Sequence, residues 1–336
     1  MSSARPPRAV TVAALAAVLL AGCGGAAATG GSTRTSSAGS PAPGGSRGCP
    51  RRVALTVQTR QEIGLGVGPL AVEGSTVWVA RPQAGDLTRV TAAGRSVARV
   101  GGTPISLAIG FGRLWVAQRD ADRIVSIDMR TLEQTTAAGV PVPVSVVAGS
   151  LGVWALSLDS GSLYQLDPVS GAASVPFDSP VADPIDMVMV GEELWLLGAS
   201  EHDLSPFNAK LGRIVRAGFN RPGQPLSGLS AAGATIWLAE PAGRSLLRVD
   251  AGTVSLQRLP APDDIRPTAT APGACGLWVA DATGDLALVD PQTATPLAPL
   301  IHVGASVAAL AASGTGVWAT DPLDGALVRV DIRSTG

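Results

Sequence analysis

Apolar residues in this 336-residue chain recur in a short phrase built around tryptophan. The segments Leu194-Trp195-Leu196-Leu197 and Val77-Trp78-Val79-Ala80 are apolar at every position, whereas a half-exposed strand alternates apolar and polar residues. Both faces of these strands must therefore be covered. Every tryptophan of the chain lies in such a phrase: Trp78, Trp115, Trp154, Trp195, Trp237, Trp278 and Trp318.

The tryptophans are separated by 37, 39, 41, 42, 41 and 40 residues. This period is typical of four-stranded propeller blades, because helical repeats are shorter, at about 33 to 34 residues. In six repeats a proline precedes the tryptophan by nine to twelve residues, which suits the first residue of a strand. We predict an all-β chain folded as a seven-bladed β-propeller with four antiparallel strands per blade. The tryptophans are expected to pack between blades; a stacking platform for a cofactor is the less favoured alternative.

A second regularity follows the tryptophans by about thirteen residues. Five repeats have an aspartate there, each followed three residues later by Ser or Thr: Asp128, Asp167, Asp250, Asp290 and Asp331. This pattern is typical of a tight turn in which the carboxylate accepts hydrogen bonds from nearby backbone N–H groups. We place the turn between the third and fourth strands and disfavour a metal-ligand role, since one carboxylate per blade spreads them around a rim.

The last repeat lacks a fourth strand, because only a third-strand pattern, Leu327 to Asp331, lies between Trp318 and Gly336. An apolar segment at residues 53–65 precedes the first blade and has the place of a fourth strand. We therefore predict that the N-terminal segment completes the last blade and closes the ring. Such closure removes an exposed strand edge.

The first 22 residues read as a signal peptide, with Arg5 and Arg8 before an apolar stretch and no acidic residue. The stretch ends in Leu20-Ala21-Gly22-Cys23, which resembles a bacterial lipobox and implies that Cys23 is lipidated. An ordinary secretory signal or a short membrane span are the alternatives. Residues 23–50 add a linker of mostly Gly, Ala, Ser, Thr and Pro, and residues 51–336 form the propeller. We expect a lipid-anchored protein on the extracytoplasmic face of the cell membrane.

The charge of the propeller limits the classes of partner that it can bind. Four of the 25 basic residues precede residue 51, leaving 21 basic against 26 acidic residues in the propeller, a formal charge of −5 that argues against nucleic acid as a partner. The Ala, Gly and Pro abundance is typical of a high-GC genome, such as an actinobacterial one.

For an exported protein we predict a disulfide between Cys49 and Cys275, with two unpaired thiols as the alternative.

The phrase from Gly112 to Asp128, G-x-LWVA followed by D-x-I-x-x-I-D, resembles the repeats of YncE-like, NHL and streptogramin-lyase propellers. The resemblance covers residues 51–336 and implies a fold shared by proteins of unrelated function. For a streptogramin lyase, the resemblance implies a site of paired histidines, a glutamate and a magnesium ion in the central mouth of the propeller. This chain has only His202 and His302, which fall on different repeats, so no catalytic residue is carried over.

The sequence contains no nucleophile elbow, phosphate loop or HExxH motif, and no cofactor is predicted. Polar residues instead gather where the tryptophan strands end and the inner strands begin, which is the expected mouth of the propeller. The candidate ligand-binding residues are Arg81, Arg119, Asp186, His202, Glu240, Asp281 and Asp321. The carboxylates Asp186, Glu240, Asp281 and Asp321 are also the candidates for a divalent cation, although acidic loop residues are more often solvated turn formers.

Two functional hypotheses follow. The first is a membrane-anchored propeller that binds a protein, peptide or envelope glycan and performs no chemistry. The alternative is a metal-dependent lyase or lactonase-type enzyme that acts at the propeller mouth. The first is favoured because the chain lacks a recognisable catalytic motif.

Overall fold

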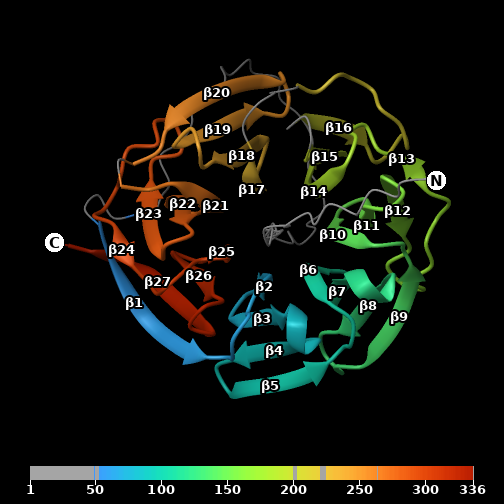
Figure 1. Cartoon of the computed structure of the whole chain (residues 1–336), viewed down its shortest axis with the longest axis horizontal. Coiled ribbons are helices and arrows are strands. Elements are labelled where there is room, and N and C mark those ends of the chain that lie inside the picture. Colours follow the sequence, from blue (N-terminus) through green and yellow to red (C-terminus); the bar gives the residue numbers. More distant parts are fainter. Residues whose placement is uncertain (1–48, 50–52, 200–202, 220–224, 263, 336) are drawn as a thin grey trace, which may run out of the picture.

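The computed structural model describes residues 49, 53–199, 203–219, 225–262 and 264–335. These residues form seven antiparallel sheets arranged radially around an axis (Figure 1). The predicted seven-bladed propeller is confirmed. Within the described ranges no helix is both long and apolar enough to cross a membrane.

Blades 1 to 3 follow one another along the chain, each with its strands in sequence order from the axis outward. Blade 1 comprises β2 (Leu70–Glu73), β3 (Thr76–Arg81), β4 (Asp86–Thr91) and β5 (Gly94–Arg99). Blade 2 comprises β6 (Pro104–Gly110), β7 (Arg113–Gln118), β8 (Arg123–Asp128) and β9 (Gln134–Gly139). Blade 3 comprises β10 (Pro143–Gly149), β11 (Gly152–Ser157), β12 (Ser162–Leu166) and β13 (Phe177–Asp178). Two short 3-10 helices, Pro82–Ala84 and Arg119–Ala121, follow β3 and β7.

Blades 4 to 6 continue this pattern with one irregularity. Blade 4 comprises β14 (Pro184–Val190), β15 (Glu193–Gly198) and β16 (Leu204–Asn208). Blade 5 comprises β17 (Ser227–Ala232), β18 (Thr235–Glu240), β19 (Ser245–Asp250) and β20 (Ser255–Pro260). Blade 6 comprises β21 (Pro267–Gly273), β22 (Gly276–Asp281), β23 (Asp285–Val289) and β24 (Ile301–His302).

The irregularity is the outer edge of blade 4, where the described residues form no continuous fourth strand. Residues 213–219 take that place and pair with β16 only at two isolated bridges, Asn208 with Arg213 and Leu204 with Phe219. The fourth position of this blade is therefore occupied by an irregular segment.

Blade 7 joins the two ends of the described chain. Its inner strands are β25 (Ala309–Ser313), β26 (Gly316–Asp321) and β27 (Ala326–Ser334), and β1 (Val53–Glu62) supplies the outermost strand. β1 runs antiparallel to β27 from the Val53–Ser334 pair to the Glu62–Ala326 pair, with one register shift after Val57. Figure 1 shows β1 in blue along the outside of the red β27. The predicted closure is confirmed.

The core consists of seven apolar clusters in the described residues, one at each junction between neighbouring blades. Each tryptophan packs at the junction between its own blade and the next. Trp115, Trp154 and Trp195 are 0% exposed. Trp318 lies at the junction of blades 7 and 1 and is the least buried of the seven. The predicted packing role is confirmed.

Arginine side chains cover several of the indole rings. Arg89, Arg248 and Arg329 lie directly opposite their blade's tryptophan on the third strand, with the guanidinium carbon 5.8, 5.9 and 5.4 Å from the ring centre. In blade 4, where Pro206 lies opposite Trp195, Arg216 of the irregular outer segment takes this place at 5.3 Å. Such cation–π contacts add to the packing energy of the rings.

The strands give the ring two different faces. We call the side with the loops between second and third strands, and between blades, the mouth face. The opposite side, with the turns that join first to second and third to fourth strands, is the hairpin face. On the hairpin face Asp128 accepts backbone N–H bonds from Arg130 and Thr131 at 2.9 and 2.8 Å, and these bonds lower its pKa.

The predicted aspartate turn recurs at Asp167, Asp250 and Asp290. For Asp331 the prediction is wrong. That residue lies inside β27, which continues to Ser334, and its carboxylate accepts a 2.6 Å bond from Arg329 Nε. Because β1 supplies the fourth strand from the other end of the chain, blade 7 has no third-to-fourth turn for Asp331 to cap.

The disulfide between Cys49 and Cys275 is formed, with a Cα–Cα distance of 5.5 Å. Cys275 lies in the turn between β21 and β22, so the bond ties the residues before β1 to blade 6 on the hairpin face. The prediction of a bridge, rather than two free thiols, is confirmed.

Candidate functional site: the polar rim of the mouth

Most of the predicted mouth residues share one structural position, the last residue of the second strand in each blade. We call these seven positions the rim; they are Arg81, Gln118, Ser157, Gly198, Glu240, Asp281 and Asp321. Each ends a buried tryptophan strand where the chain turns into the third strand. The carboxylates among them are buried: Glu240 is 0%, Asp281 3% and Asp321 1% exposed.

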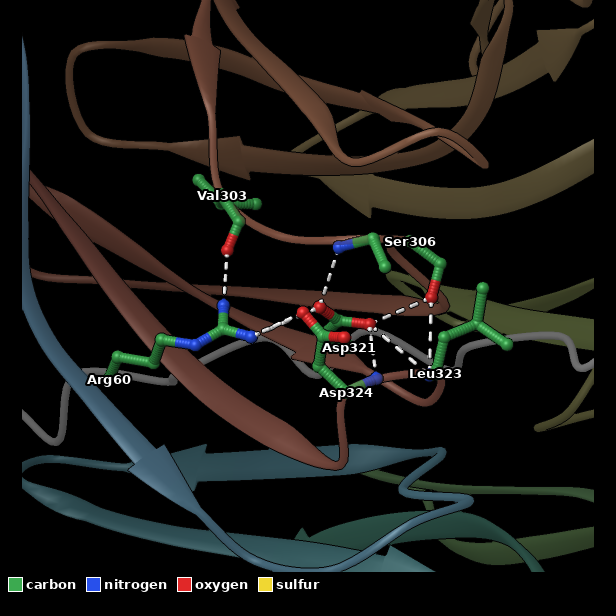
Figure 2. Close-up of polar contacts among 7 residues, drawn as sticks. Arg60, Val303, Ser306, Asp321, Leu323 and Asp324 are labelled. Atoms are coloured by element: carbon green, nitrogen blue, oxygen red, sulfur yellow. Dashed lines mark hydrogen bonds and ion pairs between the residues drawn. The ribbon is translucent and has the colours of Figure 1, made fainter.

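Asp321 lies at the centre of a hydrogen-bond network shown in Figure 2. Its Oδ1 accepts bonds from the Ser306 hydroxyl at 2.9 Å and from the backbone N–H groups of Leu323 and Asp324, both at 3.2 Å. Its Oδ2 accepts from the backbone N–H of Ala305 at 2.9 Å. Both oxygens are therefore used to hold the loop that leaves β26 and the connection that enters blade 7.

Arg60 of β1 completes this network from the outer strand. Its guanidinium donates to the Val303 carbonyl at 2.6 Å and lies 3.5 Å from Asp321 Oδ2 and 2.6 Å from Asp324 Oδ2. Burial by itself raises the pKa of Asp321, but the hydrogen bonds from Asp324, Ser306 and Ala305 together hold that pKa below its usual range. The network therefore fixes the closing strand to both blade 7 and the connection from blade 6.

Glu240 in blade 5 has an equivalent arrangement. Arg258 of β20 lies 2.6 Å from its Oε2, and the Ser245 hydroxyl donates to the same oxygen. The two arginines have the same register in their blades. Arg258 pairs with Leu247, which precedes the arginine opposite Trp237. Arg60 pairs with Val328, which precedes the arginine opposite Trp318. The N-terminal strand β1 therefore has the same position as β20 in blade 5, and it also supplies an arginine to the rim carboxylate of its blade.

The side chains of Asp281, Arg81 and Gln118 also form hydrogen bonds with nearby residues. Asp281 Oδ1 accepts from the backbone N–H groups of Thr283 and Asp285 at 2.9 and 3.1 Å. Arg81 donates from Nε to Asp86 Oδ1 at 2.8 Å. Gln118 donates to the Val100 carbonyl at 2.7 Å and so holds the connection between blades 1 and 2.

Of the other predicted mouth residues, Arg119 lies on the mouth face just beyond the rim, and His202 is not described. Arg119 begins the short 3-10 helix after β7 and is half-buried, with Nε 3.9 Å from Asp120 Oδ1. His202, like the predicted lipidation residue Cys23, lies outside the described residues.

Asp186 lies on the inner strand β14, two residues after Pro184, and is 3% exposed. Its Oδ1 accepts from the Ser145 hydroxyl of blade 3 at 3.0 Å and from its neighbour Met187 N–H at 2.9 Å, whereas Oδ2 has no hydrogen-bond partner among the described residues. Burial raises the pKa of Asp186 to about 7, despite the opposing effect of these two bonds. A similar contact joins blades 2 and 3, where Val146 N–H donates to the Ser106 hydroxyl at 3.1 Å.

The predicted carboxylates therefore do not come together. Asp186, Glu240, Asp281 and Asp321 lie on blades 4, 5, 6 and 7, each within its own set of hydrogen bonds. Among the residues that the structure describes, no group of three or more His, Cys, Asp or Glu side chains is placed to hold a metal ion. Sequence reasoning missed the partners Arg60 and Arg258, because only strand register reveals that they reach the rim.

Comparison with known proteins places the fold. The sequence matches no protein-family model and no curated protein. Virginiamycin B lyase from Staphylococcus aureus aligns with a TM-score of 0.70 and 14% identity over 82% of this chain and 99% of that chain. A further streptogramin B lyase structure gives the same TM-score and identity, over 84% and 98% of the two chains. What is shared is the propeller fold. Hydrazine synthase from Kuenenia stuttgartiensis also aligns, with a TM-score of 0.67 and 14% identity over 83% of this chain and 98% of that one.

Proposed function

We propose that this chain is an exported lipoprotein, anchored in the cell membrane through Cys23, whose propeller binds a protein, peptide or envelope glycan at the mouth face without catalysis. The observation that most supports a non-catalytic role is that the rim carboxylates are occupied by structural hydrogen bonds. Each is buried and hydrogen-bonded to nearby structure, Asp281 and Asp321 to adjoining loops and Glu240 to Ser245 and Arg258 of its own blade, which is the expected environment of a structural residue. A metal-assisted lyase or lactonase requires ligands that converge on one point.

The similarity to streptogramin lyases does not favour the enzymatic alternative, since at 14% identity it concerns the fold. It does support ligand binding by this architecture. A catalytically inactive variant of virginiamycin B lyase from Staphylococcus aureus has been solved with quinupristin. A propeller of this kind therefore accommodates a ligand when it performs no reaction.

Side chains available to a ligand on the mouth face lie in the loops beyond the rim. Leu65 and Leu323 are 74% and 65% exposed, and their two loops are joined by a 3.0 Å bond from Gly66 N–H to the Pro322 carbonyl. Arg244 is exposed in the corresponding loop of blade 5. Leu323 is followed by the exposed Asp324, and exposed leucines beside charged side chains are typical of a protein or peptide contact.

Site-specific photocrosslinking tests the binding surface. A benzophenone amino acid in place of Leu323 is expected to crosslink a discrete partner in intact cells. The same probe at Val97, which is 58% exposed on the outer strand of blade 1, serves as the matched control. Equal crosslinking from both positions, or none from Leu323, contradicts binding at the mouth face. A stoichiometric divalent cation in the purified protein would favour the enzymatic alternative instead.

The anchor has its own test. Cys23→Ser should remove incorporation of an alkyne-labelled fatty acid and release the protein from the membrane fraction. Unchanged membrane association of this variant contradicts anchoring through Cys23.

A further inference from the structure

The hairpin face combines two features that bear on how the propeller is oriented. The first is the attachment of the N-terminal segment. Because Cys49 is bonded to Cys275 in the β21–β22 turn, the chain from Cys23 must reach the propeller on this face. The 25 residues between Cys23 and Cys49 are mostly Gly, Ala, Ser, Thr and Pro, and a flexible segment of that length has a root-mean-square span of about 25 to 30 Å.

The second feature is a set of exposed apolar side chains at turns of the same face. Phe111 is in the first hairpin of blade 2, and Leu132, Val169 and Leu211 are in the turns that follow the third strands of blades 2, 3 and 4. Their exposed fractions are 50%, 42%, 86% and 55%, respectively. Blades 2 and 3, which carry the turns of Phe111, Leu132 and Val169, lie across the ring from blade 6 and its disulfide (Figure 1).

Phe111 occupies a turn position at which the hairpin needs a left-handed backbone conformation, the conformation that favours glycine. Its φ is 57°, in the left-handed region that is unfavourable for a bulky residue. The first residue of the equivalent turn is a glycine in four other blades, Gly74, Gly191, Gly233 and Gly314, with φ between 57° and 60°. Phe111 lines a surface groove of about 670 Å³ together with Leu151 and Pro168. A strained, half-exposed aromatic ring points to a contact outside the domain.

The charges beside these turns have both signs. Arg130 lies in the turn with Leu132, and Lys210 precedes Leu211. Asp128 is in the turn with Leu132 and Asp167 is in the turn with Val169, and hydrogen bonds from backbone N–H groups keep the pKa of both carboxylates low. Electrostatic attraction to one type of headgroup is therefore not the dominant force. Apolar side chains at an interface fit a contact with lipid irrespective of headgroup charge.

We propose that the hairpin face lies on the membrane, with Phe111, Leu132, Val169 and Leu211 in contact with lipid, and that the mouth face points away from it. This proposal rests on the lipid anchor proposed above. A short linker between anchor and domain gives an effective concentration of the order of millimolar, so a weak apolar contact is sufficient once the anchor is inserted. The orientation leaves the mouth face open to ligands from the envelope.

Fluorescence quenching by brominated lipid tests this orientation in the lipidated full chain. Val169→Trp and Leu323→Trp place an added indole at exposed positions on the two faces, and the seven native tryptophans are common to both. In vesicles of brominated phosphatidylcholine and phosphatidylglycerol at about 3:1, the Val169→Trp signal should be quenched relative to wild type and the Leu323→Trp signal should not. Quenching should persist in 1 M salt, because the contact is apolar.

The outcomes separate the two proposals. A wild-type chain that does not float with the vesicles contradicts the anchor and this orientation together. A chain that floats but shows equal quenching at both positions, quenching at Leu323→Trp alone, or none, contradicts only the orientation. Phe111→Gly, which removes the ring and the strain, should fold and float normally yet reduce the quenching of Val169→Trp.

Discussion

At the scale of single residues, the fold depends on indole rings packed between blades. Trp115 is fully buried among residues of blades 2 and 3, and its Nε1 donates to the Gly110 carbonyl at 3.2 Å. Trp318 has the same position in blade 7 but is only partly buried. The repeat spacing predicted this role, whereas the arginines over four of the rings became visible only when strand register placed them opposite.

Truncation of these two rings should have unequal effects. Trp115→Ala should lower the free energy of unfolding by about 3 to 5 kcal/mol, because it leaves a large cavity in a close-packed junction. Trp318→Ala should cost less, since its ring already contacts solvent. Denaturant unfolding of both variants checks this, and equal losses would contradict the difference in packing.

Asp186 is the residue whose protonation should be visible in stability. Burial raises its pKa from 3.8 to about 7, so between these values the folded state binds a proton that the unfolded state has lost. The free energy of unfolding should therefore fall as pH rises from about 4 to 7 and level off above, a contribution of about 2 to 4 kcal/mol at most.

Asp186→Asn isolates this contribution. The amide oxygen can still accept from Ser145 and Met187, but no charge forms, so the variant should gain stability relative to wild type at pH 8 and gain clearly less at pH 5. Chemical unfolding at the two pH values provides the measurement. An equal difference at both would show that Asp186 does not titrate in this range.

At the scale of elements, the important feature is the closing strand. A strand count in the sequence was enough to predict that residues near 53–65 complete blade 7, and β1 occupies Val53–Glu62. The sequence pattern did not predict the irregular outer edge of blade 4 or the loss of the aspartate turn at Asp331. Both depend on which segment lies beside the third strand, and that is decided by tertiary pairing rather than by local spacing.

The disulfide should contribute to the stability of this closure. It joins residues 226 positions apart, so the constraint that it places on the unfolded chain is large. Replacing Cys49 and Cys275 by serine should lower the free energy of unfolding by about 2 to 5 kcal/mol. Calorimetry of the double variant against the oxidised wild type measures the loss, and unchanged stability would show that β1 holds without the bridge.

At the scale of the whole molecule, the ring presents a mouth face stabilised by buried polar residues and a hairpin face that carries the disulfide. The candidate mouth residues were predictable from where the tryptophan strands end. Their roles were not, because a carboxylate such as Asp321 reads the same in the sequence whether it binds a cation or holds a loop. The contacts from Ser306, Ala305 and Arg60 distinguish these roles, and they come from distant parts of the chain (Figure 2).

The most direct test of the structural role of the rim is the melting temperature of wild type and Asp321→Asn, each measured before and after treatment with EDTA. The account predicts that the substitution lowers the melting temperature by several degrees, that EDTA leaves the wild type unchanged, and that the difference between the two proteins is the same in both conditions. A wild-type protein that EDTA destabilises to the level of Asp321→Asn would contradict it, because the carboxylate would then act through a bound metal.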